Sequence, residues 1–272
     1  MNLTSIPPEF FSSINFRNVR VLSLAENAMA DLPAELFNMA WITQLKLMHN
    51  KLSKIPEDIG KLKELRILWI QHNLLSSLPE SLIRCVHLSA LDFSSNTAIS
   101  FVPLCYAYMT NLTLLNANEC AINTPPPTIM TKNIKKIQEY LQRLIFAQKS
   151  NIFRHTDIQI ITIPELLFDW LPNLTAIDLS HCDLRVVQDA FFPSFCLLVS
   201  MDLSHNLLSE ISPQISLLTH LTYLDVSANL ITCLPANIGF LPLQTFNYLQ
   251  KGMVSDPIGP SEFEGKSRNS KQ

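Results

Sequence analysis

Glycine is scarce in this sequence. Only five glycines occur among 272 residues, and their spacing leaves no glycine-rich loop. The chain therefore lacks both the G-x-x-x-x-G-K-[ST] loop that cradles nucleotide phosphates and the G-x-G-x-x-G turn of dinucleotide-binding folds. The signature motifs of protein kinases are absent as well. We expect no catalytic activity of these kinds and no cofactor.

Charge is also sparse. Charged residues make up 16% of the chain, below the usual quarter of soluble proteins. The formal net charge is -3, and the basic residues are scattered along the sequence. Because a basic patch is what binds phosphate backbones, we expect no nucleic-acid partner.

Cysteine pairs and long apolar runs are missing. None of the six cysteines forms a C-x-x-C pair or a spacing typical of a metal site. No apolar run reaches membrane-spanning length, and the first residues lack the basic and apolar regions of a signal peptide. These absences predict a cytoplasmic protein with reduced thiols, no metal site and no membrane partner.

A repeat dominates what is present. Each copy reads L-x-x-L-x-L-x-x-N-x-L and continues with x-x-L/I-P-x-x-I. Because several positions recur together in most copies, the pattern predicts a repeat architecture. Intervals of 23 residues separate the asparagines within two series, Asn27, Asn50, Asn73 and Asn96, then Asn206 and Asn229.

The repeat positions have physical meanings. The L-x-L step has period two, which predicts a short strand with alternate residues facing inward. One repeat cannot bury its own apolar face, so stacked copies should form a parallel sheet over one continuous core. The inward asparagine needs hydrogen-bond partners and should tie neighbouring turns together. Cys120 and Cys182 stand at this position, and we interpret both thiols as structural.

The repeats are interrupted near the middle of the chain. A run of apolar residues at helical spacing predicts an amphipathic helix over residues 132–148. Such a helix either packs on the solenoid or docks a partner, and we favour packing because an apolar stripe usually marks core contact. The apolar positions are Ile134, Ile137, Leu141, Leu144 and Ile145.

These patterns predict a fold class and a domain organisation. The fold class is α/β, a repeat solenoid (horseshoe) with a parallel concave sheet, interrupted by one amphipathic helix. The expected parts are a first array (1–124), a proline-led helical insertion (125–150), a second array (151–255) and a disordered tail (256–272).

Three segments carry a family resemblance. I-P-E-D-I-G-K-L-K-E-L (Ile55 to Leu65) resembles the intracellular leucine-rich-repeat family with 23-residue units, which includes Ras-pathway scaffolds and the repeat regions of Roco proteins. The interruption from Pro125 to Leu144 and the I-T-I-P-E-L-L-F restart from Ile161 to Phe168 resemble the subgroup of leucine-rich repeat-containing protein 40. The resemblance covers about residues 1–250 and implies cytosolic protein–protein interaction without catalysis.

The concave strand surface is where we expect a protein partner of unknown identity to bind. Its outward positions predict two patches, one mixed and aromatic, the other acidic. Trp69 amid polar neighbours has the composition of an interface hot spot, or else lies flat on its neighbours without a partner. The predicted site residues are Lys46, Met48, His49, Trp69, Gln71, His72 and Asp92 in the first patch, and Asp178, Asp202 and Asp225 in the second.

Other functions remain open at this point. His49 and His72 should be adjacent, but no obvious third ligand accompanies them, so we expect no metal site. The favoured function is a monomeric scaffold or adaptor in signalling, without catalysis. One alternative is the regulatory repeat portion of a larger Roco-like GTPase or kinase. Another is a hydrolase that uses rows of Asp, His and Ser, such as Asp178, His181 and Ser180.

Overall fold

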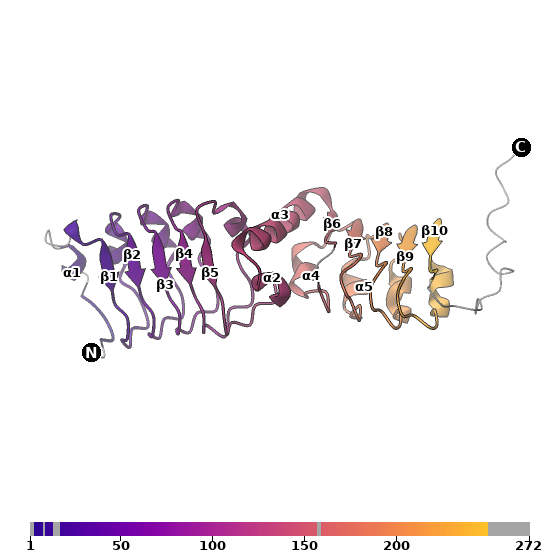
Figure 1. The fold of residues 1–272 in the computed structure, drawn as a ribbon, viewed down its shortest axis with the longest axis horizontal. Helices are drawn as coiled ribbons and strands as arrows, with labels where there is room; N and C mark the ends of the chain where they lie inside the picture. The colour runs from indigo at the N-terminus through magenta and orange to yellow at the C-terminus, as the bar shows by residue number, and fades with distance from the viewer. Residues whose placement is uncertain (1–2, 8, 13–16, 157–158, 250–272) are drawn as a thin grey trace, which may run out of the picture. The chain divides into compact units, whose positions relative to one another are not determined.

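A computed structural model describes residues 3–7, 9–12, 17–156 and 159–249 (Figure 1). The chain divides into two compact units, residues 1–146 and 147–272. The tail that we expect to be disordered, residues 256–272, lies outside the described residues, as does the end of the expected second array.

The first unit contains a parallel five-stranded sheet whose strands follow one another in chain order. In the first four strands the central residue is buried and its two neighbours face outward, as the L-x-L pattern predicts. The register pairs equivalent repeat positions, for example Leu45 with Leu68. The strands are β1 (Val21–Ser23), β2 (Gln44–Lys46), β3 (Ile67–Trp69), β4 (Ala90–Asp92) and β5 (Leu114–Asn116).

The second unit contains a second parallel sheet of five strands, also in chain order. The repeat pattern did not predict the first strand of this sheet. The second inward position, just after that strand, holds the fully buried His155 in place of an apolar residue. The strands are β6 (Ile152–Arg154), β7 (Ala176–Asp178), β8 (Ser200–Asp202), β9 (Tyr223–Asp225) and β10 (Thr245–Asn247).

Short helical turns carry the chain back from one strand to the next. Proline precedes or opens most of them, because its fixed φ suits a helix start and its missing N–H costs nothing there. The turns of the first unit are α1 (Glu9–Ser12), η2 (Ala34–Asn38), η3 (Glu57–Lys61), η4 (Glu80–Arg84), η5 (Leu104–Tyr108) and α2 (Pro127–Met130); those of the second are α4 (Leu166–Trp170), α5 (Phe191–Ser194), η6 (Pro213–Leu217) and η7 (Ala236–Phe240).

Buried asparagines join successive repeats. The Asn73 amide donates to the carbonyls of Leu47 and Ile70, both at 3.0 Å, and its Oδ1 accepts from the Leu52 N–H at 3.0 Å. Two of these three partners belong to the preceding repeat, so one side chain fixes the stacking of two turns. Asn50, Asn96, Asn206 and Asn229 make equivalent bonds.

Cysteine replaces this asparagine twice. The Cys182 thiol lies 2.8 Å from the carbonyl oxygen of His155, and the Cys120 thiol lies 3.3 Å from that of Phe93. A thiol donates once where the amide donates twice and accepts once. Both thiols therefore act in packing, as the repeat position predicts.

The residue before each inward asparagine or cysteine adopts the left-handed conformation. Its φ lies between 53° and 62° in every regular copy, although none of these residues is glycine. Such a conformation is uncommon for side chains with a Cβ and persists where the surrounding bonds hold it. The residues are Glu26, His49, His72, Ser95, Glu119, His181, His205 and Ala228.

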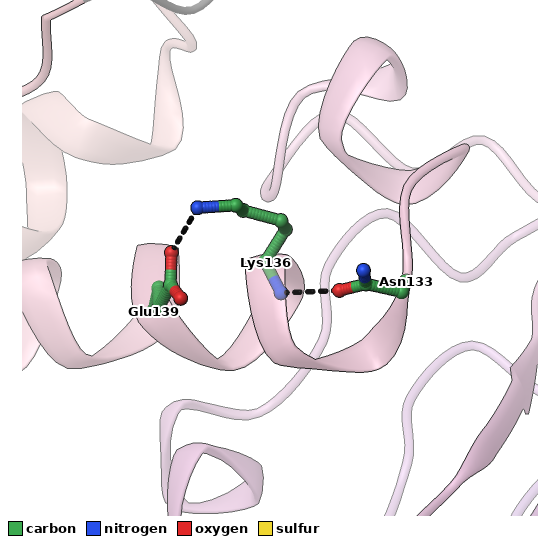
Figure 2. Close-up of polar contacts among 3 residues, drawn as sticks. All are labelled: Asn133, Lys136 and Glu139. Atoms are coloured by element: carbon green, nitrogen blue, oxygen red, sulfur yellow. Dashed lines mark hydrogen bonds and ion pairs between the residues drawn. The ribbon is translucent and has the colours of Figure 1, made fainter.

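Helix α3 (Ile134–Ser150) interrupts the repeats (Figures 1 and 2). Asn133 caps its first turn, since the Asn133 Oδ1 accepts from the Lys136 N–H at 3.1 Å. Lys136 also forms an exposed ion pair with Glu139 at 2.7 Å. The division between the two compact units falls within this helix, after residue 146.

The apolar stripe of α3 is used within the chain. Ile137, Tyr140 and Leu141 are buried. The amides of Gln138 and Gln142 donate to the carbonyls of Met109 and Ala107, at the end of η5. The structure thus favours packing on the first unit over a helix kept free for a partner. None of the helices in the described residues has the length and hydropathy of a membrane span.

Candidate partner-binding surface

The sheet of the first unit brings one outward position of each repeat into a row. Parallel register places Lys46 beside Trp69 and Trp69 beside Asp92. The Lys46 ammonium lies 4.6 Å from the centroid of the Trp69 ring, a cation–π contact. Trp69 is partly buried, and Lys46 lies over its ring.

Two histidines flank this row at the ends of neighbouring strands. The rings of His49 and His72 stack with centroids 4.2 Å apart and an interplanar angle of 10°. Stacked rings point their nitrogens in parallel, not toward one shared ion. Among the residues that the structure describes, no group of three or more His, Cys, Asp or Glu is placed to hold a metal. His181 and His205 form an equivalent pair in the second unit.

Met48 and Gln71 complete the first patch as partly buried neighbours of these histidines. Gln71 Oε1 is buried and accepts no hydrogen bond within the described part of the chain. The structure thus gathers all seven residues predicted for the first patch on β2, β3, β4 and the turns that follow β2 and β3.

The second unit shows a row of different chemistry. Register places Arg154, Asp178, Asp202, Asp225 and Asn247 side by side across β6 to β10. The outward strand position of the repeat predicted the three aspartates. Arg154 was missed because the strand that carries it does not fit the repeat pattern.

A depression of about 230 Å³ lies on this sheet. Apolar side chains form part of it, and Arg154, Asp178, Asp202 and Tyr223 supply most of its polar groups. Tyr223 was also missed, since it stands one row away from the aspartates. The complete lining is Ile152, Arg154, Ala176, Ile177, Asp178, Ser200, Asp202 and Tyr223.

Each aspartate of the D-x-S pattern accepts a bond from the serine two residues later. The Asp178 Oδ1 accepts from both the backbone N–H and the hydroxyl of Ser180, at 3.1 and 2.8 Å. The Asp202 Oδ1 accepts from the Ser204 N–H at 2.9 Å. These local bonds hold the carboxylates at the strand ends.

The aspartates differ in the hydrogen bonds that their Oδ2 atoms accept. The Asp225 Oδ2 accepts from Asn247 at 2.8 Å and from the Tyr223 hydroxyl at 3.5 Å. Burial raises the pKa of Asp225, but these bonds and those from Ser227 outweigh it and leave the pKa below its ordinary value. The Asp92 Oδ2 likewise accepts from Asn116 at 3.0 Å.

Asp178 and Asp202 keep their second oxygen open. In the described residues, no hydrogen bond or ion pair reaches the Oδ2 of either side chain. Both side chains are partly buried and line the depression. Of the four aspartates predicted to bind a partner, these two have the most capacity to do so.

The Asp, His and Ser rows do not form a charge relay. A hydrolase of this type needs histidine between serine and aspartate. Here the Ser180 hydroxyl donates directly to Asp178, and the His181 ring stacks on His205. The geometry in the described residues does not support the hydrolase interpretation.

Thiol reactivity offers a test of the cysteine environments. Burial, followed by the nearby charge of Glu80, raises the pKa of Cys105 to about 11. Only the thiolate is nucleophilic, so alkylation of Cys105 should speed up about tenfold per pH unit between pH 8 and pH 10. Peptide-resolved mass spectrometry after iodoacetamide treatment measures this, with the exposed Cys196 and Cys233 labelled first. Fast labelling of Cys105 at pH 8 would contradict the assigned environment.

A family comparison agrees with this geometry. Residues 172–231 match the family model described as leucine rich repeat. No curated protein matches the chain. The regular repeats of the chain share the same strand, inward asparagine or cysteine and returning turn, and together with the match this geometry supports a relation to the leucine-rich-repeat family. The fold class is the leucine-rich-repeat solenoid.

Solved structures with similar folds come from several kinds of organism. A leucine-rich-repeat protein of Leptospira interrogans is 21% identical, with a TM-score of 0.39, over 91% of this chain and 64% of its own. The functional domain of InlJ from Listeria monocytogenes is 18% identical, with a TM-score of 0.39, over 91% and 46%. The plant peptide hormone receptor RGFR1, solved in complex with RGF2, is 20% identical, with a TM-score of 0.40, over 90% and 34%. The chain spans less than two thirds of each of these proteins.

Proposed function

We propose that this chain is a non-catalytic adaptor that binds a protein partner on the concave faces of its two sheets. One observation carries the proposal: outward side chains form two rows of different chemistry, a Lys46–Trp69 row and an Asp178–Asp202 row. A large aromatic side chain on a sheet face and two adjacent carboxylates with an open oxygen each are groups that a protein partner can contact. Leucine-rich-repeat proteins commonly bind protein partners, which supports the proposal.

The first patch has the composition of an interface hot spot. Tryptophan is enriched among residues that dominate binding energy, and Trp69 stands between a cation and a carboxylate. Gln71 contributes a buried oxygen without a donor in the described residues, and His72 an exposed ring. An incoming partner would meet polar and aromatic groups within one small area.

The setting of this function is part of the proposal. We propose a cytoplasmic, monomeric protein in signalling, as the resemblance to the intracellular family of Ras-pathway scaffolds implies. The inward thiols of Cys120 and Cys182 support a reducing compartment, because they serve as packing groups and not as disulfide partners.

A capture experiment tests the function. The intact chain, a Trp69→Ala/His72→Ala variant and an Asp178→Asn/Asp202→Asn variant are each used to retain proteins from cytosol. A Glu165→Gln/Glu210→Gln variant removes the same charge as the aspartate variant from exposed positions outside the strands, and serves as its control. Circular dichroism first establishes that all four are folded.

We expect a partner that the intact chain and the control retain, and that one patch variant loses at least about tenfold. The variant that loses it identifies the face that binds. Equal retention by all four proteins would contradict binding on the concave faces, and retention of no protein would contradict the adaptor function itself.

A further inference from the structure

Two carboxylates, each with an open oxygen, stand on adjacent strands and line the depression of the second sheet. Asp178 and Asp202 are paired in register on adjacent strands, which are roughly 4.8 Å apart. Their Oδ1 atoms are held by Ser180 and Ser204, which fixes the direction of each carboxylate. Two like charges at this separation repel each other, and a cation between them would relieve the repulsion.

The residues around Asp178 and Asp202 indicate which kind of cation fits between them. Arg154 lies at one end of the row, but no ion pair within 4.0 Å joins it to Asp178 in the described residues. Asp225 lies at the other end with both oxygens occupied. The partly buried Tyr223 and the apolar Ile152 complete the lining. The depression thus offers two acceptors, an aromatic ring and apolar contact, with the Arg154 side chain at one end of the row.

The size of the depression limits what enters. Pockets for drug-sized ligands and cofactors span about 300–1,000 Å³. The depression measures about 230 Å³, so it accepts a single side chain more readily than a cofactor. A bare divalent cation would find two carboxylates, fewer protein ligands than Ca²⁺ takes.

We infer that the depression between Asp178, Asp202 and Tyr223 receives the guanidinium of an arginine side chain from the protein partner. A planar guanidinium has five N–H donors, enough to bridge two carboxylates on adjacent strands. Its face also stacks on an aromatic ring, a contact that Tyr223 supplies. The inference rests on the proposed adaptor function and adds the chemistry that the partner presents.

A titration with small probes tests this directly. The full chain, labelled with ¹⁵N, is titrated with N-acetyl-arginine-methylamide while its amide resonances are recorded. The neutral citrulline analogue and the lysine analogue serve as comparisons. The Asp178→Asn/Asp202→Asn variant keeps the acceptor for each serine but removes both charges, and Glu165→Gln/Glu210→Gln again serves as the charge-matched control.

We expect the arginine probe to shift the amides of β7, β8 and β9 with saturation. Binding should weaken at least about tenfold in the aspartate variant and stay unchanged in the control. The citrulline probe should cause no saturable shift. Absence of saturation with the arginine probe, equal binding of the citrulline probe, or unchanged binding by the aspartate variant would overturn the inference. Lysine binding as tight as arginine binding would overturn the assignment to a guanidinium.

The titration needs no partner, so the two proposals fail separately. If the chain retains a protein from cytosol but the arginine probe causes no saturable shift, the adaptor function stands and the arginine inference falls. If the probe binds but no protein is retained, the adaptor function falls while the guanidinium site stands.

Discussion

Asn73→Ala is expected to lower the free energy of unfolding of the first unit by about 3–5 kcal/mol. The substitution leaves the Leu52 N–H without its partner. It also removes one of the two amides that donate to each of the Leu47 and Ile70 carbonyls, which keep Asn50 and Asn96 as donors. Asn73 is only 5% exposed, so water cannot replace these bonds without opening the stack. A buried N–H that loses its partner costs about 1–3 kcal/mol, and each of the two lost bonds to a carbonyl that keeps another donor costs about 0.5–1.5 kcal/mol.

Urea unfolding followed by tryptophan fluorescence measures this effect. Trp41 and Trp69 report on the first unit and Trp170 on the second, so the two transitions are followed separately in single-tryptophan backgrounds. Asn118→Ala is the matched control, because Asn118 is exposed in a later repeat of the same unit; its substitution should change stability by less than about 0.5 kcal/mol. Equal effects of the two substitutions would contradict the structural role of the inward asparagine.

Gly60→Ala is expected to cost about 2–3 kcal/mol through overpacking. A Cβ at Gly60 would lie 2.8 Å from the Ser81 carbonyl oxygen and 2.9 Å from the Ser81 Cβ. Both atoms belong to the start of η4, where the Glu57 carboxylate accepts from the N–H groups of Glu80 and Ser81. Relief of the clash would require η3 and η4 to separate, which would disturb this cap and the packing beneath it.

Gly239→Ala provides the matched comparison. Gly239 stands at the same position of η7, and a Cβ there would meet no atom within 4 Å. Both substitutions restrict the unfolded chain equally, so their difference isolates the contact in the folded state. We expect Gly239→Ala to be neutral or to stabilise by up to about 1 kcal/mol, as measured by urea unfolding. A similar loss in both variants would contradict the close approach of η3 to η4.

Most of the architecture was predictable because residues at equivalent positions of successive repeats lie side by side in the folded chain. Leu45 and Leu68 pair in register because each stands at the same position of its copy. The exception is β6, where Phe153 faces inward but the next inward position, just after the strand, holds His155 in place of an apolar residue. An apolar L-x-L pattern misses a strand that is followed by a polar residue at the second inward position, although the parallel sheet continues through it.

The candidate site was predictable in its rows but not in its chemistry. Repeat spacing indicated that Lys46 and Trp69 would be neighbours, and that Asp178 and Asp202 would be. It did not indicate that Lys46 covers the Trp69 ring. Tyr223 belongs to the neighbouring row, so its place at the depression depends on how side chains lean across the sheet.

The sequence by itself determined the repeat, the inward asparagines, the strands that carry L-x-L and the outward rows, because each depends on contacts between equivalent positions of adjacent copies. Only the tertiary structure decided which carboxylates remain open. Asp225 and Asp178 share the same local D-x-S pattern, yet Asn247 from the next strand occupies the second oxygen of Asp225, whereas Asp202 stands at that place beside Asp178. This difference in hydrogen bonding depends on contacts between side chains of adjacent strands, at positions where the repeat pattern does not specify the residue.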